Sequence, residues 1–324
     1  MDSGEKAKDA ITDQAAAWLV RLDSGTADTE QFERWRNADF RHASVFAQVA
    51  ATWKRTGDLR GLSPAPAIPA DEAPEPVRTT RRAMLGSLVG AGALAAAGTA
   101  ALLWDRRAYA ETAVGERRTV QLPDGSRAEL NTATRIAWRF GDRREFWLER
   151  GEAAIVVAAD RARPFVLRAD AMRAALEAGR YNGRILTAGP RLVTLAGRAL
   201  VDTGNGARRA LSAGHALALT GTRFRETTLA QGEADALTAW QRGEILFDGM
   251  PLSDAVAEFN RYLPRPIAIE DRSIATIRLG GRFFTDDPQG FLTALHDGFG
   301  ISSRVRDGKV TLYRAPETAP VAAQ

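Results

Sequence analysis

The sequence contains no cysteine, which excludes disulfide bonds, thiolate metal ligands and cysteine nucleophiles. Histidine is nearly as scarce: His42, His215 and His296 are the only ones in 324 residues, and each stands alone in its local sequence. We therefore expect no metal centre and no other bound cofactor. A dense basic block is lacking too, because the formal net charge of +4 comes from scattered arginines. Direct binding of nucleic acid is consequently not expected.

Groups with the arrangement needed for catalysis are also scarce. Ser212 precedes His215 by three residues, but strand alternation would point the two to opposite faces, and no orienting acid has a clear place. Asp287 is most simply a helix cap, and Glu149 and Glu152 flank a turn glycine. We predict that the protein is not an enzyme.

The chain does have a long uncharged segment at residues 83–104, rich in alanine, glycine and leucine. As an α-helix it would rise about 33 Å, enough to cross a bilayer core of about 30 Å. Arg81 and Arg82 precede it, and Trp104 ends it at the place of an interfacial aromatic residue. A buried soluble helix, a cleaved signal peptide and a single span of the lipid bilayer are the three structures to compare.

The single span is the favoured structure for this segment. An apolar run of this length without a polar face is long for a buried helix, and about 80 residues of structured-looking sequence precede it, which disfavours a signal peptide. The pair Arg81–Arg82 has two interpretations that the residues do not separate, a twin-arginine export signal and a cytoplasmic-side anchor. The sequence thus predicts one transmembrane helix between two folded ends.

Residues 1–60 show helical periodicity in three short runs. Asp28 with Gln31 forms a plausible capping box at the start of the second run. Three tryptophans are a large aromatic load for such a small unit, so they form either a small core or a surface offered to a partner. The candidate partner-binding residues are Trp18, Leu19, Leu22, Trp35 and Trp53.

Beyond the uncharged segment the apolar period changes to two. Short strands punctuated by glycine and aspartate, with a hairpin around a Pro-Asp-Gly turn at 123–125, are typical of an all-β sandwich or roll. One helical interruption is expected at 171–179. From about residue 235, strands alternate with two helices in the order β-α-β-β-α-β-β, which predicts a small α+β domain. Asp287 caps the second helix, with Pro288 at its first position.

Seven phrases of the sequence occur together in a familiar order. They are "AAAWLVRLDSG", "FERWRNADFRHASVF", "VQLPDGSRAELN", "WLERGEAAIVVAAD", "RPFVLRAD", "AWQRGEILFDGMPLSDAVAEFNRY" and "GGRFFTDDPQGFLTAL". Together they resemble the FecR family of transmembrane regulators, which comprises anti-sigma factors and signal transducers of the ferric-siderophore type. The resemblance covers about residues 11–57 and 110–314. It departs from the family pattern at "EAGRYNGRI", with Tyr181 near an aromatic position, which puts the local strand in doubt.

The resemblance implies a membrane-spanning anti-sigma factor that controls iron-siderophore uptake genes. Its N-terminus would lie in the cytoplasm and bind an extracytoplasmic-function sigma factor. The remainder would lie in the periplasm of a Gram-negative bacterium, where it would meet the signalling domain of a TonB-dependent outer-membrane receptor. Intramembrane and periplasmic proteases would release the cytoplasmic piece. The alternative is a membrane-anchored periplasmic adaptor or glycan-binding protein without a sigma-factor client.

The expected fold is therefore multidomain: a small all-α unit, one transmembrane helix, an all-β FecR domain and a C-terminal α+β domain similar to the short N-terminal domain of secretins and TonB-dependent receptors. Strand addition along the outer strand at 309–314 is a reasonable mode of receptor contact. The expected bounds are 1–60 for the helical sigma-factor-binding unit, 61–80 for a proline-rich linker, 83–104 for the span, 110–232 for the FecR domain, 238–315 for the α+β domain and 316–324 for a tail.

Overall fold

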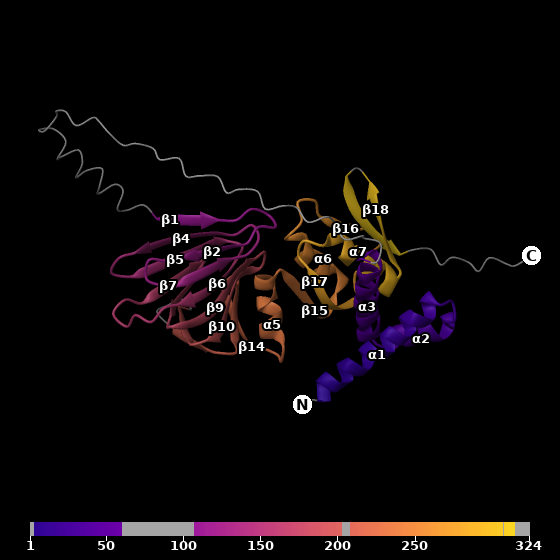
Figure 1. Cartoon of the computed structure of the whole chain (residues 1–324). Helices are drawn as coiled ribbons and strands as arrows, with labels where there is room; N and C mark the ends of the chain where they lie inside the picture. Colours follow the sequence, from indigo (N-terminus) through magenta and orange to yellow (C-terminus); the bar gives the residue numbers. More distant parts are fainter. Residues whose placement is uncertain (1–2, 60–106, 203–207, 307, 315–324) are drawn as a thin grey trace, which may run out of the picture.

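The computed structural model describes residues 3–59, 107–202, 208–306 and 308–314 (Figure 1). Buried apolar side chains in these ranges form three clusters. One lies among the N-terminal helices, one between two large β-sheets, and one inside the C-terminal helices and strands. The described part of the chain is thus mostly β, with a helical unit at its N-terminal end.

The helical unit consists of α1 (Ser3–Asp23), α2 (Thr29–Ala38) and α3 (Phe40–Leu59). Asp28 is the N-cap of α2, and its side chain accepts a hydrogen bond from the backbone N–H of Gln31 at 3.1 Å, as the capping pattern predicts. The three helices bury Ala15, Trp18, Phe32, Phe46 and Ala50 between them.

Two sheets form a β-sandwich, and each has seven strands among the described residues. The first runs in the order β1 (Ala108–Glu111), β4 (Arg135–Phe140), β5 (Arg144–Arg150), β7 (Phe165–Ala169), β8 (Met172–Leu176), β11 (Arg198–Asp202) and β12 (Arg208–Ser212). The second runs β14 (Arg223–Thr228), β13 (His215–Thr220), β10 (Gly189–Ala196), β9 (Gly179–Leu186), β6 (Glu152–Val157), β3 (Arg127–Leu130) and β2 (Arg118–Gln121). Buried side chains of both sheets form one core, as strand alternation requires. The predicted hairpin is present, with β2 antiparallel to β3.

The helical interruption predicted at 171–179 is wrong, because this segment forms β8 and the start of β9. Met172, Ala174 and Leu176 are buried while the residues between them are not, so the burial period is two. The doubtful strand around Tyr181 is present as part of β9. Tyr181 is buried, its hydroxyl donates to the carbonyl oxygen of Glu177 at 2.9 Å, and burial raises its pKa to about 12.

The C-terminal unit follows the predicted order of strands and helices. It comprises β15 (Glu244–Pro251), α6 (Leu252–Asn260), β16 (Ile267–Ile269), β17 (Arg278–Phe284), α7 (Pro288–Phe299), β18 (Ile301–Arg306) and β19 (Lys309–Arg314). Asp287 caps α7, since its side chain accepts from the N–H of Gly290 at 2.8 Å, and Pro288 begins the helix. The short elements α5 (Glu233–Thr238), η1 (Ala239–Arg242) and η2 (Arg272–Ile274) were not expected from the sequence pattern.

The outer strand of this unit is not the predicted one. The three-stranded sheet has the order β16-β19-β18, so β19 is central, and it pairs parallel with β16 and antiparallel with β18. The edge beyond β18 is unpaired within the described residues, and Val305 on this strand is 74% exposed. A strand-addition surface would therefore involve β18 in place of residues 309–314.

The fold prediction is also wrong in its transmembrane helix. None of the helices in the described ranges combines the length and the apolar character needed to cross a membrane. The segment predicted to span, 83–104, and its flanks Arg81, Arg82 and Trp104 lie outside the described residues, as do the predicted linker at 61–80 and the tail at 316–324.

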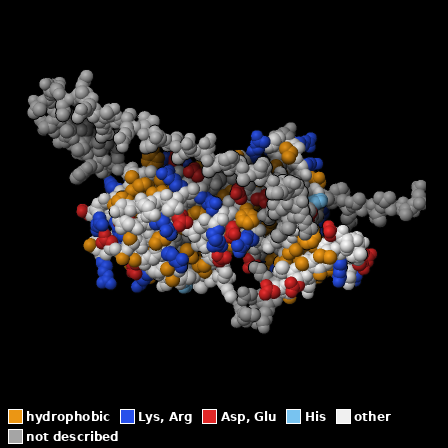
Figure 2. Space-filling model, in the orientation of Figure 1, with side chains coloured by type: hydrophobic (Ala, Val, Ile, Leu, Met, Phe, Trp, Pro, Cys, Tyr) orange, Lys and Arg blue, Asp and Glu red, His pale blue; other side chains and the backbone are white. Residues whose placement is uncertain are grey.

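The helical unit contacts the C-terminal unit directly. Helix α3 packs against α7 and β17, and Ala47 of α3 belongs to the C-terminal apolar cluster. Figure 1 shows α3 beside these elements, with the β-sandwich on their other side. The two units are thus packed against each other in the structure. On the face drawn in Figure 2, acidic and basic side chains intermingle.

Candidate partner-binding and relay sites

The aromatic residues of the helical unit divide into buried and exposed groups. Trp18 is 8% exposed, and its ring lies 5.6 Å from the ring of Phe32 and 6.3 Å from that of Trp35. The indole N–H of Trp35 donates to the Oε1 atom of Gln14 at 2.8 Å, and its ring stacks on His42. Trp18 and Trp35 therefore contribute to the small core of the unit.

The remaining candidates differ in exposure. Leu19 is half-buried against the same core, whereas Leu22 is 36% and Trp53 44% exposed, as is the neighbouring Val20 at 55%. Large apolar side chains at the surface of a small unit are typical of partner interfaces. The structure thus separates the candidates by burial, while the binding of a partner by any of them stays a prediction.

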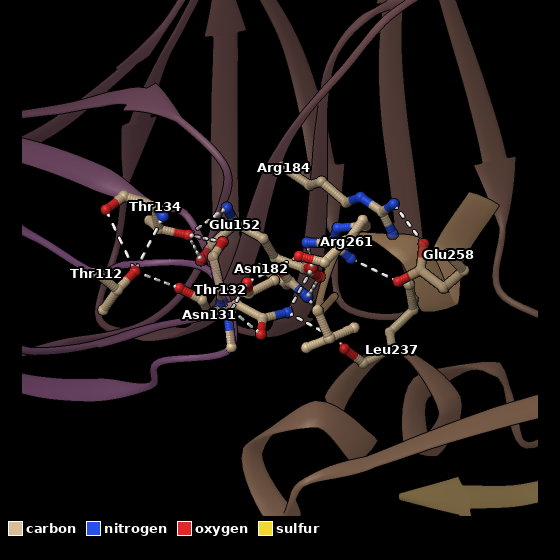
Figure 3. Close-up of polar contacts among 12 residues, drawn as sticks. Thr112, Asn131, Thr132, Thr134, Glu152, Asn182, Arg184, Leu237, Glu258 and Arg261 are labelled. Carbon is tan, nitrogen blue, oxygen red and sulfur yellow. Dashed lines mark hydrogen bonds and ion pairs between the residues drawn. The ribbon is translucent and has the colours of Figure 1, made fainter. Parts of the chain in front are cut away.

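A second polar site joins the sandwich to the C-terminal unit, and sequence reasoning had not singled it out (Figure 3). Its centre is Glu152, the first residue of β6, which is 2% exposed. The carboxylate accepts hydrogen bonds from Asn131 at 3.0 Å, from Asn182 at 3.1 Å and from the guanidinium of Arg261 at 2.6 Å. Because Arg261 follows α6, this ion pair crosses between the two units.

Arg261 is shared by a second carboxylate. Glu258 on α6 accepts from Arg261 at 2.5 Å and from Arg184 of β9 at 2.6 Å. Burial alone would raise the pKa of Glu258, but the positive charges of Arg261 and Arg184 outweigh that effect and hold the pKa below its ordinary value. Burial opposes the charge of Arg261 as well, yet Glu152 and Glu258 raise its pKa above the ordinary value.

Neutral groups complete the junction. The Tyr262 hydroxyl accepts from the Asn131 side chain at 2.9 Å, and burial raises the pKa of Tyr262 to about 12. The hydroxyl of Thr132 donates to the carbonyl oxygen of Arg261 at 2.9 Å, and the Asn182 side chain donates to the carbonyl oxygen of Leu237 at 3.2 Å. The two units are therefore joined by bonds that run from β9 and from the residues after β3 to Leu237 of α5 and to the residues after α6.

This arrangement favours rigid coupling over proton transfer. The two carboxylates face two guanidinium groups, so the charges balance. The lowered pKa of Glu258 keeps it ionised near neutral pH, and the raised pKa of Tyr262 keeps it protonated, so neither is poised as an acid or a base. A displacement of α6 would be transmitted to β6 and β9 through these contacts.

Two pairs of residues were considered for catalysis, and the members of each pair lie on different strands. Ser212 ends β12 with its side chain exposed, and His215 begins β13, where its Nδ1 atom is 3.3 Å from the carboxylate of Glu226. Glu149 is an exposed partner of Arg135, on a different strand from Glu152. In the part of the chain that the structure describes, no group of three or more His, Cys, Asp or Glu side chains could hold a metal ion.

The sequence around the junction residues gives only a weak indication of their role. Arg261 and Tyr262 directly follow an amphipathic helix, where a charged residue and an aromatic are unremarkable, and Glu152 opens a strand whose other residues are apolar. A charged residue at the start of a buried strand is the one clue that could have identified Glu152, because unpaired charges are costly inside a core. Its charged partner Arg261 lies 109 positions away and could not be read from spacing.

The comparisons with known proteins agree with the division of the chain seen in the fold. Residues 108–200, which run from β1 into β11, match the family model described as FecR protein. The chain carries a FecR domain. Residues 13–52, which lie in the helical unit, match a second model, described as a domain of unknown function (DUF4880). No curated protein matches the chain.

The chain is also similar to solved structures. Two crystal structures of a "putative anti-sigma factor" from Parabacteroides distasonis superpose with a TM-score of 0.55 at 21% sequence identity. They cover 65% and 64% of this chain and the whole of the matched chain. At this identity the similarity shows a shared fold.

Proposed function

We propose that this chain is an anti-sigma factor that relays a signal from its FecR and C-terminal units to its helical unit. The observation that supports it most is the combination, in one chain, of a FecR domain with a small helical unit that leaves Leu22 and Trp53 exposed. The fold shared with a chain described as an anti-sigma factor points the same way.

The proposed partner of the helical unit is an extracytoplasmic-function sigma factor. Trp53 and Leu22 offer the aromatic and aliphatic surface that commonly dominates binding energy, while the buried Trp18 and the half-buried Trp35 keep the helices in place. A regulator of this kind needs no catalytic centre, and the ion-paired junction at Glu152 is suited to coupling two units.

Co-purification of the full chain with each extracytoplasmic-function sigma factor of its source organism tests the proposal. We expect one of them to be retained, and Trp53→Ala to lower its retention at least tenfold. Tyr109→Ala is the matched control, because Tyr109 is an exposed aromatic residue on the β-sandwich (61%). The proposal fails if no sigma factor is retained, or if the two variants reduce retention equally.

For the signal-receiving end, we propose strand addition by the signalling domain of a TonB-dependent receptor along β18. This strand lies at a sheet edge with Val305 exposed, and edge strands are ready templates for a further strand. We expect Val305→Pro to abolish binding of the receptor domain, and Val305→Thr, which keeps its N–H, to preserve it. Equal binding by both variants would rule out this contact.

The remaining parts of the sequence-based hypothesis stay predictions. These are the control of siderophore uptake, the proteolytic release of the helical unit, and the location of the two ends in cytoplasm and periplasm.

A further inference from the structure

The first strand of the β-sandwich leaves one of its edges unpaired. Strand β1 (Ala108–Glu111) ends its seven-stranded sheet, where β4 is its neighbour. Figure 1 shows β1 along the upper border of the sandwich, beyond β4. In the part of the chain that the structure describes, no strand pairs with the other edge of β1. An unpaired edge is a template for a further strand unless charge, proline or a bulge protects it, and β1 has neither a proline nor a bulge.

The pairing of β1 with β4 determines which backbone groups point outward. Thr112 continues the register of β1, and its backbone N–H donates to the carbonyl oxygen of Thr134 at 2.9 Å. In an antiparallel pair the hydrogen-bonded positions alternate along the strand, so Ala108 and Ala110 also direct their backbone groups to β4. The backbone groups that point to the free edge belong to Tyr109 and Glu111, with Arg107 next in the same series.

The side chains of these three residues face the outside of the sandwich, because Ala110 between them is buried in the core. Tyr109 is 61% exposed, and Glu111 is exposed as well. The guanidinium of Arg107 lies over the ring of Trp147, 4.0 Å from its centroid. A stacked guanidinium keeps its N–H donors in its own plane, where a carboxylate can accept from them. The outer face of this edge therefore carries a cation, an aromatic ring and an anion at every second residue.

This order is complementary to itself. If a second copy of β1 lies antiparallel with Tyr109 opposite Tyr109, Arg107 of each copy faces Glu111 of the other, as two-fold symmetry requires. The outward backbone groups then meet each other as well, so the ladder of hydrogen bonds can continue across the contact. Other registers are disfavoured by charge. Centring the pair on Glu111 would oppose two carboxylates, and centring it on Arg107 would oppose two guanidinium groups.

We propose that β1 is a homodimer contact, in which it pairs antiparallel with β1 of a second copy of this chain around a two-fold axis at Tyr109. The two first sheets then become one continuous sheet. The contact is short and buries little area, so the dimer is expected to be weak and reversible. It leaves β18 of each copy free, since that strand lies in a different sheet of the C-terminal unit. The inference does not depend on the proposed anti-sigma function.

Exchange of the two charges in the full chain tests both the contact and its register. Arg107→Glu and Glu111→Arg each oppose like charges in their own homodimer, and we expect each to lower the self-association constant at least tenfold. Mixed in equal amounts, the two variants present opposite charges to each other at both positions, so association should return to the wild-type value. Sedimentation velocity over a series of concentrations measures all three samples against the wild type.

Two outcomes of this experiment would overturn the proposal. One is a wild-type chain that stays monomeric over the whole series, and the other is a mixture that associates no better than the separate variants. Because Glu111 also accepts from Arg135 at 3.1 Å, far-UV circular dichroism should first establish that Glu111→Arg is folded. If it is not folded, the cysteine experiment below decides.

Tyr109→Cys provides that independent measurement, and the absence of native cysteine makes it clean. Directly opposite residues of a hydrogen-bonded antiparallel pair have Cα atoms about 5.5 Å apart, within the range of a disulfide. We expect this variant to form a covalent dimer under mild oxidation at least tenfold faster than Val114→Cys. Val114 is the matched control, because it is exposed in the turn that follows β1. Equal rates for the two variants would rule out pairing at Tyr109.

Discussion

The hydroxyl of Ser44 accepts a hydrogen bond from the backbone N–H of Gly280, which lies 236 positions further along the chain. This bond connects the helical unit to the C-terminal unit, and the ring of Phe40 lies beside Gly280. Three consequences of this contact and of the Glu152 junction, and one of the burial of the tryptophans, can be measured with substitutions in the full chain.

Gly298→Ala tests the close packing of α3 against α7. In an exposed helix this change is stabilising by about 1 kcal/mol, because glycine is a poor helix former. With α3 in place the new methyl group would press on Ala43 and Ala47, and we expect a net loss of about 1 kcal/mol. Thermal unfolding measures the difference. Gly141→Ala, at a site with no neighbour within 4 Å, should change stability little, and a stabilised Gly298→Ala protein would contradict the contact.

Glu152→Ala should lower the free energy of unfolding by about 3 kcal/mol, because it removes the carboxylate that the half-buried Arg261 and the buried Asn131 and Asn182 share. Glu149→Ala is the matched control, since Glu149 lies three residues earlier in an exposed ion pair and should contribute at most about 0.5 kcal/mol. Urea denaturation followed by tryptophan fluorescence gives both values. Similar losses in the two variants would show that the junction does not couple the units.

The junction should also weaken in acid. The pKa of Glu258 in the folded protein lies below its unfolded value of about 4.3, so its stabilisation is present above that pH and is lost as the pH falls through the folded value. The stability gap between the wild type and Glu258→Gln should be constant from about pH 8 to pH 5 and should narrow below about pH 4. Denaturant titrations across this range measure it, and a gap that stays unchanged at pH 3 would contradict the prediction.

Trp18→Ala and Trp53→Ala should differ in their effect on folding. Trp18 packs against Phe32 and Trp35, and its loss should cost about 3 kcal/mol, enough to unfold the small helical unit. Trp53 is exposed, so its loss should change stability by less than about 0.5 kcal/mol. Far-UV circular dichroism separates the two, and loss of helix in Trp53→Ala would place this residue in the core.

Local patterns in the sequence predicted local structure well. The cap at Asp28, the turn between β2 and β3, and the Asp287–Pro288 start of α7 each depend on residues a few positions apart. The alternating strands and the order of the C-terminal elements were predicted for the same reason. The segment at 171–179 was misassigned because its alanines suit a helix, whereas pairing with β7 and β11 makes it a strand.

Long-range relationships could not be predicted in this way. The outer strand of the C-terminal unit was predicted at 309–314, but pairing with β16 on one side and β18 on the other places this strand, β19, in the centre. Helix α3 showed one apolar stripe, and the small residues Ala43, Ser44 and Ala47 gave no reason to expect a second partner. The contacts of Glu152 with Arg261 join positions 109 residues apart.

The sequence by itself determined the helical unit, the β-sandwich strands and the α+β order, because hydrophobic period, caps and turns act over a few residues. It also carried the phrases that match the FecR model. Only the tertiary structure decided which tryptophans are buried, which strand is the edge, and which charges meet at the junction. Those outcomes depend on the packing of distant segments, where burial and electrostatic pairing are settled by contacts that no local pattern encodes.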